Sequence, residues 1–333
     1  REGPQEGRAM LLDSFDSLLL DLDGVVYRGK QAIPGAVEAI NRAQAEGKKI
    51  GYITNNASRT PEQIAQQLRG FGLKVEGEEI IGSARAAAKI LAQRIPPSSK
   101  VLVVGGEGLR SEVSALGFEL VESASESPVA VIQGFSPSVG WEHLAQAAFA
   151  IQAGAIWIAT NQDWTIPLEA GIAPGNGTLV GAVHTAVGQL PDFAGKPFRP
   201  IFDSALEQLD IQSPLVIGDR LDTDIKGAIG AGLQSACVLT GIATKKELLG
   251  AKSDERPGYI LQDLSELFLD YPELKTTRRG VSCRGSEVEL LGDKIVCSSQ
   301  NPKELDSLRA AASLIWTSGR PIYGLQVEQE LMG

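Results

Sequence analysis

The segment Ser17–Asp23 (SLLLDLD) is a short apolar run that ends in two carboxylates. Its apolar residues are continuous and do not alternate with polar ones, which is typical of a parallel strand buried on both faces. A helical pattern over residues 35–46 follows, and Lys49–Thr54 then repeats the strand pattern. This order predicts an α/β chain with a doubly wound, Rossmann-like parallel-sheet core.

Strand and helix patterns keep alternating as far as Asp270. Thr60-Pro61-Glu62-Gln63 has the sequence of a helix start, because Thr60 and Gln63 can cap each other's backbone amides. Further strands are predicted at residues 101–104, 129–133, 156–160, 214–218, 235–239 and 259–261. Further helices are predicted at residues 108–116, 139–152, 201–209, 223–231 and 264–269.

The pattern changes after Tyr271-Pro272-Glu273. Residues 275–280 (KTTRRG) are charged and end in glycine, which is typical of a linker. Beyond them a small C-terminal α+β module is expected over residues 281–333, with strands at 287–291, 294–297 and 322–327 and a helix at 303–316. A module of about 55 residues buries little core alone. We therefore expect it to pack against the rest of the chain or a second copy through Leu308, Leu314, Ile315 and Trp316.

No segment has the pattern of a membrane span or a signal peptide. Residues 1–9 are rich in Gly, Glu and Arg and precede Met10, so we expect a flexible leader there. No apolar segment follows a basic start, as a signal peptide would require. No apolar run approaches the ~20 residues of a transmembrane helix.

The charge of the chain restricts its partners. A formal net charge of −10 disfavours nucleic acid and anionic membranes, which both reward clustered Lys and Arg. A small phosphorylated metabolite remains a compatible partner, provided that a metal or a local positive charge binds it. Self-association into a homo-oligomer is also compatible with the sequence.

Cysteine and histidine usage excludes several kinds of site. Cys237, Cys283 and Cys297 form an odd set without CxxC spacing, which favours free thiols and a cytoplasmic protein over a Cys283–Cys297 disulfide. His143 and His184 lie in helical patterns and outside any metal-binding motif. Catalysis by a Ser-His-Asp or Cys-His arrangement therefore has little support.

The two acids Asp21 and Asp23 leave a buried strand, and the carboxyl ends of such strands are where open α/β sheets bind ligands. Asp21 is placed to attack phosphorus, forming an acyl phosphate. Asp23 is placed to protonate the leaving oxygen and then deprotonate water. Gly24 allows the chain to turn sharply there, which frees backbone N–H groups for phosphate oxygens. A calcium-binding EF-hand is excluded, because Val25 occupies the position of its third acid.

A second acidic motif, Gly218–Asp224 (GDRLDTD), follows another buried strand. Carboxylates at neighbouring strand ends repel one another unless a cation neutralises them, and Mg2+ prefers carboxylate and water ligands. Asp219 is expected beside Asp21, and Asp224 supports the site from the start of the next helix. Capping of that helix is the alternative role of Asp222 and Asp224. The candidate magnesium ligands are Asp21, Asp23, Asp219 and Asp224.

Two further positions offer groups for a phosphate. Thr54-Asn55-Asn56 ends a predicted strand and supplies a hydroxyl and backbone amides, although this sequence is also ordinary turn chemistry. Lys196, in Gly195-Lys196-Pro197, can neutralise the charge on the nucleophile and the phosphoryl group. A single loop lysine is usually solvated, so the functional interpretation of Lys196 depends on the presence of the other motifs.

In this order the motifs resemble those of the haloacid dehalogenase superfamily, over roughly Phe15–Asp270. The resemblance assigns Asp21 and Asp23 to the first motif, Thr54 to the second, Lys196 to the third, and Asp219 with Asp224 to the fourth. It narrows to the NagD-like, p-nitrophenyl phosphatase and phosphoglycolate phosphatase branch on four segments, YITNNAS, ATNQD, PGNG and the residues from Asp219 to Ile225. It implies a Mg2+-dependent phosphatase that forms an aspartyl-phosphate and acts on small monoesters of the glycerol 3-phosphate or phosphoglycolate type.

The spacing of the motifs predicts where an inserted cap lies. Only 33 residues separate Asp21 from Thr54, whereas 142 separate Thr54 from Lys196. We therefore predict an α/β cap over residues 83–190, with the core formed by residues 10–82 and 191–274. Caps exclude water and contact the leaving group. Asn161 and Asp163 are candidate cap contacts to substrate, with loop capping as their alternative role.

Four other functions remain as alternatives. A phosphomutase shares both acids but usually carries its cap between the first two motifs, where this chain has too few residues. A dehalogenase would lack Asp23, and a phosphate-metabolite sensor without turnover would not need it. A dinucleotide site at Gly105–Gly108 is disfavoured, because Ser111 replaces the last glycine of its motif.

The C-terminal module resembles the acetyltransferase-like tail of actinobacterial glycerol 3-phosphate phosphatases. It has no pyrophosphate-binding loop, so we expect a packing, oligomerisation or regulatory role.

Overall fold

The computed structural model describes residues 9–299 and 303–333, which form two compact units. One unit holds the chain up to Arg28 together with Ala32–Lys48 and Ser213–Gly333. The other holds Gly29–Gln31 and Lys49–Gln212. The predicted leader lies outside the described residues except for Ala9. The predicted boundaries of core and cap at residues 82 and 190 stay predictions.

The first unit contains four parallel strands in the order β15-β14-β13-β1. These are β1 (Ser17–Leu20), β13 (Pro214–Gly218), β14 (Gln234–Val238) and β15 (Tyr259–Leu261). Every residue of β1 and β13 is buried, which confirms the prediction of a sheet covered on both faces. Ser17 pairs with Pro214 and Leu20 with Ile217, so both strands end at the same edge.

Helices and short turns precede, connect and follow these strands. They are η1 (Leu11–Ser14), α1 (Ala36–Ala45), η4 (Leu221–Ile225), α8 (Lys226–Gly230), α9 (Lys245–Leu249), η5 (Ser253–Glu255) and η6 (Leu264–Phe268). The short strand β2 (Tyr27–Arg28) belongs to this unit, and β3 (Gln31–Ala32) spans the boundary between the two units. Two predictions need correction. The helix predicted at residues 223–231 begins as the π-helical turn η4, and the one predicted at 264–269 is the 3-10 turn η6.

The second unit contains a five-stranded parallel sheet in the order β12-β9-β8-β6-β7 and a parallel pair, β4–β5. A separate antiparallel hairpin is formed by β10 and β11. The strands are β4 (Lys49–Thr54), β5 (Ile80–Gly82), β6 (Lys100–Val104), β7 (Glu119–Val121), β8 (Ala130–Gln133), β9 (Ile156–Ala159), β10 (Thr165–Leu168), β11 (Gly171–Pro174) and β12 (Asp192–Phe193). The parallel sheets confirm the predicted α/β class.

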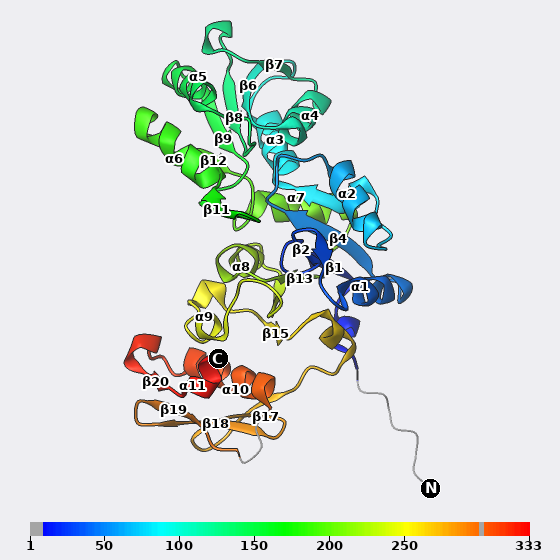
Figure 1. Cartoon of the computed structure of the whole chain (residues 1–333), viewed down its shortest axis with the longest axis vertical. Helices are drawn as coiled ribbons and strands as arrows, with labels where there is room; N and C mark the ends of the chain where they lie inside the picture. Colours follow the sequence, from blue (N-terminus) through cyan, green and yellow to red (C-terminus); the bar gives the residue numbers. More distant parts are fainter. Residues whose placement is uncertain (1–8, 300–302) are drawn as a thin grey trace. The chain divides into compact units, whose positions relative to one another are not determined.

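Helices pack against this sheet (Figure 1). Side chains of α5 and α6 share an apolar cluster with Leu102, Val131 and Trp157 of the strands, and α3 contacts β8 and β9. The helices and turns are α2 (Pro61–Gly70), η2 (Gly77–Glu79), α3 (Ser83–Arg94), α4 (Glu107–Ala115), η3 (Ala124–Glu126), α5 (Trp141–Gln152), α6 (Asn176–Val187) and α7 (Arg199–Leu209).

The start of α2 confirms the predicted capping box. The Thr60 hydroxyl accepts a hydrogen bond from the backbone N–H of Gln63 at 3.2 Å. The Gln63 side chain in turn accepts one from the N–H of Thr60 at 2.9 Å. Two N–H groups that the first turn leaves without helical partners are thereby satisfied.

The C-terminal module lies in the first unit and consists of a mixed sheet with helix α10 packed against it (Figure 1). Its elements are β16 (Leu274–Thr276), β17 (Gly280–Cys283), β18 (Ser286–Leu291), β19 (Lys294–Cys297), α10 (Glu304–Thr317), η7 (Ile322–Gly324), β20 (Gln326–Val327) and α11 (Gln329–Met332). The linker predicted at 275–280 is wrong, because β16 pairs there with β17. The strand predicted at 322–327 begins as the turn η7, and only Gln326–Val327 form the strand β20.

The module shares one apolar core with the α/β part of its unit. Leu308, Leu314 and Ile315 of α10 belong to the same buried cluster as Leu248 and Ile260, and Trp316 packs against it. This confirms the prediction that the tail packs against the rest of the chain. The shared core means that both parts of this unit stabilise each other.

A buried arginine, Arg309, adds a polar connection between the module and β15. Its side chain is 2% exposed and donates to the Ile260 carbonyl at 3.0 and 2.7 Å. It also donates to the carboxylates of Asp306 and Glu266 at 3.1 Å. A buried charge is tolerated only when it is paired and hydrogen-bonded in this way.

The described residues also show the state of the thiols and the character of the helices. Cys237, Cys283 and Cys297 are all free, as predicted. Cys283 and Cys297 lie on β17 and β19, with β18 between them. Over residues 9–299 and 303–333, no helix has both the length and the apolar character that crossing a bilayer requires.

Candidate active site

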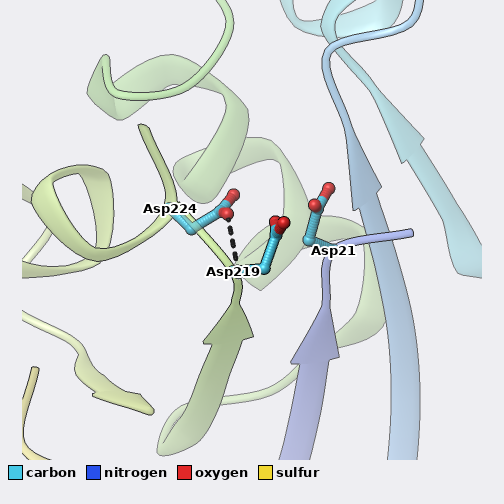
Figure 2. Close-up of side chains that lie close together, drawn as sticks. All are labelled: Asp21, Asp219 and Asp224. Atoms are coloured by element: carbon cyan, nitrogen blue, oxygen red, sulfur yellow. Dashed lines mark hydrogen bonds between the residues drawn. The ribbon is translucent and has the colours of Figure 1, made fainter. Parts of the chain in front are cut away.

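Three carboxylates meet at the carboxyl ends of β1 and β13 (Figure 2). Asp21 follows β1, Asp219 follows β13, and Asp224 lies in the turn η4. Each offers an oxygen, and these oxygens all lie within 4.8 Å of one another. Asp219 is 2% exposed and Asp224 is 1% exposed, while Asp21 is half-buried.

Backbone amides hold the two buried carboxylates in place. One Asp224 oxygen accepts hydrogen bonds from the N–H groups of Asp219 at 3.2 Å and Arg220 at 3.1 Å. Asp219 accepts a hydrogen bond from the N–H of Ile242 at 2.7 Å. The charge of a carboxylate strengthens such bonds, so the loop between β13 and α8 is built around these acids.

Gly24 confirms the predicted sharp turn after the first motif. Its φ of +86° is in the left-handed region, and a Cβ atom would lie 2.6 Å from Cγ of Asp219. Its N–H donates to the Tyr27 carbonyl at 2.8 Å, so this amide is engaged within the chain. A phosphate contact at Gly24 stays a prediction, and the observed role of this glycine is to let the turn approach Asp219.

Asp23 follows Asp21 by two residues and presents part of its side chain to solvent. Desolvation by the surrounding protein raises the pKa of its carboxyl, and the charge of Arg28 opposes part of this rise. A raised pKa suits a group that must donate a proton. Its carboxylate is outside the group of Asp21, Asp219 and Asp224, so its predicted role as a metal ligand stays a prediction.

The three clustered acids fit a magnesium ion. Hard divalent cations prefer carboxylate oxygens, and Mg2+ is commonly held by one or two carboxylates and several waters. Carboxylates this close, two of them buried, are electrostatically unfavourable without a compensating cation. The geometry therefore supports the predicted assignment of Asp21, Asp219 and Asp224 as ligands.

The second unit contains the other predicted site residues, beginning with Thr54 and Asn56 at the end of β4. The Thr54 hydroxyl accepts a hydrogen bond from the N–H of Asn56 at 3.0 Å. The Asn56 side chain caps the following turn by accepting from the N–H and hydroxyl of Ser58, both at 2.9 Å. The predicted turn chemistry is thus present, and the phosphate contacts stay predictions.

Asn55, Asn161, Asp163 and Lys196 come together in the same unit. The Asn55 side chain forms hydrogen bonds with the main chain of Lys196 and with the Asp163 carboxylate. The backbone carbonyl of Asn55 accepts a hydrogen bond from the Asn161 side chain. Asn161 is 4% exposed and its Oδ1 accepts from the N–H of Asp163 at 3.1 Å. The predicted alternative role of Asn161 as a loop cap is therefore present, and its contact to substrate stays a prediction.

The loop after β14 also supports Asp219, and no sequence motif pointed to it. Besides the Ile242 amide, Thr240 contributes a hydroxyl that donates to the Gly24 carbonyl at 2.7 Å. Arg28 donates to the Thr240 carbonyl at 2.9 Å and so ties this loop to the turn after β1. The available signal was Thr240-Gly241, a polar residue and a glycine at the carboxyl end of a third parallel strand.

Comparisons with protein families agree with this geometry. A family model described as haloacid dehalogenase-like hydrolase matches residues 18–119, and a second, described as HAD-hydrolase-like, matches residues 193–267. Together these matches include Asp21, Thr54, Lys196 and Asp219.

Curated relatives extend the similarity to most of the chain. D-glycerol 3-phosphate phosphatase of Mycobacterium tuberculosis is 40% identical over 92% of this chain and 87% of its own length. Acid sugar phosphatase of Staphylococcus saprophyticus is 35% identical over 77% of this chain and 98% of its own length.

Solved structures show the same similarity. Glycerol phosphate phosphatase of M. tuberculosis, in complex with magnesium, superimposes with a TM-score of 0.87 at 38% identity, covering 96% of this chain and 95% of that one. p-Nitrophenyl phosphatase of Archaeoglobus fulgidus gives a TM-score of 0.71 at 31% identity, covering 77% of this chain and 98% of that one. The second comparison leaves part of this chain unmatched, whereas the first spans nearly all of it.

Proposed function

Since this chain belongs to the haloacid dehalogenase-like hydrolases, we propose that it is a Mg2+-dependent phosphatase of small phosphate monoesters that works through Asp21. The observation that carries the proposal is the group of Asp21, Asp219 and Asp224 oxygens within 4.8 Å of one another. This group places Asp21, the proposed nucleophile at the end of β1, beside Asp219 and Asp224, the buried acids expected to bind a divalent cation.

The first half of the reaction uses both acids of the first motif. A carboxylate oxygen of Asp21 attacks phosphorus, and the bond between phosphorus and the ester oxygen breaks. Asp23 gives its proton to that departing oxygen, so the product leaves as an alcohol. The chain then carries an acyl phosphate on Asp21.

The second half returns the enzyme to its starting state. Asp23, now a carboxylate, takes a proton from water while the water oxygen attacks phosphorus. The bond between phosphorus and Asp21 breaks, which releases inorganic phosphate and restores both side chains. One residue thus serves as acid and then as base.

Positive charge must accompany these steps, because the nucleophile and the phosphoryl group are both anionic. Bound Mg2+ supplies Lewis-acid neutralisation of that charge. From the four-motif resemblance we assign Lys196 the role of binding a phosphoryl oxygen and Thr54 the role of donating a hydrogen bond to another. Such preorganised donors stabilise the transition state more than the ground state.

For the substrate, we propose glycerol 3-phosphate first and phosphoglycolate second. The supporting observation is the M. tuberculosis D-glycerol 3-phosphate phosphatase, whose similarity extends over 92% of this chain. The acid sugar phosphatases match 77% of it. We also propose a cytoplasmic location, on the basis of three free cysteines.

A panel of phosphate esters assayed with Mg2+ tests this function. We expect glycerol 3-phosphate to give the highest kcat/KM, phosphoglycolate and sugar phosphates lower values, and p-nitrophenyl phosphate turnover as an artificial substrate. Release of inorganic phosphate is the measurement. Binding of these esters without release would favour a sensor, and transfer of the phosphoryl group within the substrate would favour a phosphomutase.

We expect Asp23→Asn to slow turnover by roughly 10²–10⁴-fold, because an amide neither protonates the leaving oxygen nor deprotonates water. The effect should depend on the leaving group. p-Nitrophenolate leaves without protonation, so the variant should form phospho-enzyme from p-nitrophenyl phosphate and accumulate it. Rapid-quench labelling with a 32P substrate measures this, and equal slowing of formation and breakdown would contradict the assigned roles.

A further inference from the structure

The side chain of Asn55 is paired with the backbone of Lys196. Its Oδ1 accepts a hydrogen bond from the N–H of Lys196 at 2.8 Å, and its Nδ2 donates to the Lys196 carbonyl at 3.1 Å. An amide side chain that bonds to both main-chain groups of one residue fixes the position and the direction of that residue. Lys196 itself is 3% exposed, and its Nζ donates to the Ile53 carbonyl at 3.2 Å.

Other segments of the same unit hold Asn55 in turn. The backbone carbonyl of Asn55 accepts hydrogen bonds from the Ser83 hydroxyl and from Nδ2 of Asn161, both at 2.8 Å. Its Nδ2 also lies 3.2 Å from each oxygen of the Asp163 carboxylate. Asn161 is anchored by Asn176, whose Nδ2 donates to the Asn161 carbonyl at 2.8 Å. Residues far apart in the sequence thus meet at this one asparagine.

Gly195, the residue before Lys196, leaves the space that this contact requires. A Cβ atom at Gly195 would lie 2.5 Å from Oδ1 of Asn55 and 2.5 Å from the Thr160 carbonyl oxygen. Real Cβ atoms do not approach oxygen so closely. Any other residue at position 195 would therefore displace the Asn55 side chain and the Thr160 backbone from their observed positions. The glycine therefore permits the pairing between Asn55 and Lys196.

We infer that the side chain of Asn55 positions Lys196 and does not itself bind the substrate. The two hydrogens of its amide nitrogen already face the Lys196 carbonyl and the Asp163 carboxylate, so none remains to donate to a phosphate. The inference rests on the proposed function for one point, namely that the Lys196 amine binds the phosphoryl group. Displacing a positioned group by about 1 Å can cost about 10²-fold in rate.

A double-mutant cycle tests this inference. We expect Asn55→Ala to lower kcat by roughly 10–100-fold, since the lysine is then present but misplaced. Lys196→Ala should lower it further, and the double variant should match Lys196→Ala within about threefold, because Asn55 acts only through that lysine. Losses that multiply in the double variant, or a raised KM with unchanged kcat in Asn55→Ala, would overturn the inference. Gln63→Ala is the matched control, because this amide also bonds to a backbone N–H of the same unit, and its kcat should not change.

Amide hydrogen exchange gives a second reading that needs no turnover. The N–H of Lys196 should be protected in the wild-type protein and exchange at least ~10-fold faster in Asn55→Ala, while the N–H groups of α2 keep their protection. A Lys196 N–H that exchanges freely in the wild-type protein would overturn the inference even if the variant does not fold. Full activity of Lys196→Ala would instead contradict the proposed role of Lys196, leaving the exchange result to decide the pairing.

Discussion

Asp21→Asn is expected to abolish turnover while leaving the fold intact. An amide oxygen is not an effective nucleophile toward phosphorus, and an amide cannot bind Mg2+ as an anion. The loss of a covalent nucleophile should lower kcat by several orders of magnitude, on the order of 10⁴-fold or more. Phosphate release from glycerol 3-phosphate and p-nitrophenyl phosphate is the measurement, with far-UV circular dichroism to check the fold.

The structure offers a matched control for this substitution. Asp222 lies in the same acidic segment as Asp219 and Asp224, but its carboxylate is exposed and accepts from Arg220 at 3.1 and 2.9 Å. Asp222→Asn makes the same chemical change outside the carboxylate group and should keep kcat within about twofold. Activity of Asp21→Asn within tenfold of the wild-type protein would exclude Asp21 as the nucleophile.

Removal of the metal should be equally severe. Without a cation, the clustered carboxylates of Asp21, Asp219 and Asp224 repel an anionic substrate as well as one another. We expect excess EDTA to stop phosphate release and added Mg2+ to restore it. Ca2+ should bind and inhibit, because it prefers more oxygen ligands at longer distances and would hold Asp21 in a poor attack geometry.

A variant separates metal binding from a general requirement for salt. Asp219→Asn removes one anionic ligand but keeps an oxygen for the Ile242 amide, so the half-saturating Mg2+ concentration should rise by at least ~10-fold. The same titration of Asp222→Asn should superimpose on that of the wild-type protein. Undiminished turnover in excess chelator would rule out the metal site.

The strands that hold the acids could be predicted because burial imposes a simple pattern. β1 and β13 lie where continuous apolar residues end in aspartate, and β4 ends at Thr54 as the sequence indicates. The carboxyl ends of parallel strands share an edge, so the meeting of Asp21 and Asp219 followed from the order of elements alone. The capping pair of Thr60 and Gln63 also made the start of α2 predictable.

Contacts made by backbone atoms could not be predicted in this way. The amide that holds Asp219 belongs to Ile242, and any residue except proline could supply it. The pairing of β16 with β17 was missed because KTTRRG has the composition of a loop, whereas a partner strand decides whether it becomes an edge strand. The contacts of the Asn55 side chain with Lys196 and Asp163 were also not predictable, because the sequence shows this amide but not the groups that it meets in the fold.

The pairing of β1 with β13 has a consequence for biosynthesis. Ser17 lies beside Pro214, so β1 leaves the ribosome almost 200 residues before the strand that pairs with it. At about 5–20 residues per second this delay is roughly 10–40 s, during which an apolar strand has no neighbour on that side. Pairings this distant in sequence also slow folding, because the loop must close before the contact stabilises it. Asp21 is thus translated almost 200 residues before Asp219, and the two meet only once the chain has been made as far as residue 219. We expect nascent chains shorter than this to be chaperone clients without phosphatase activity.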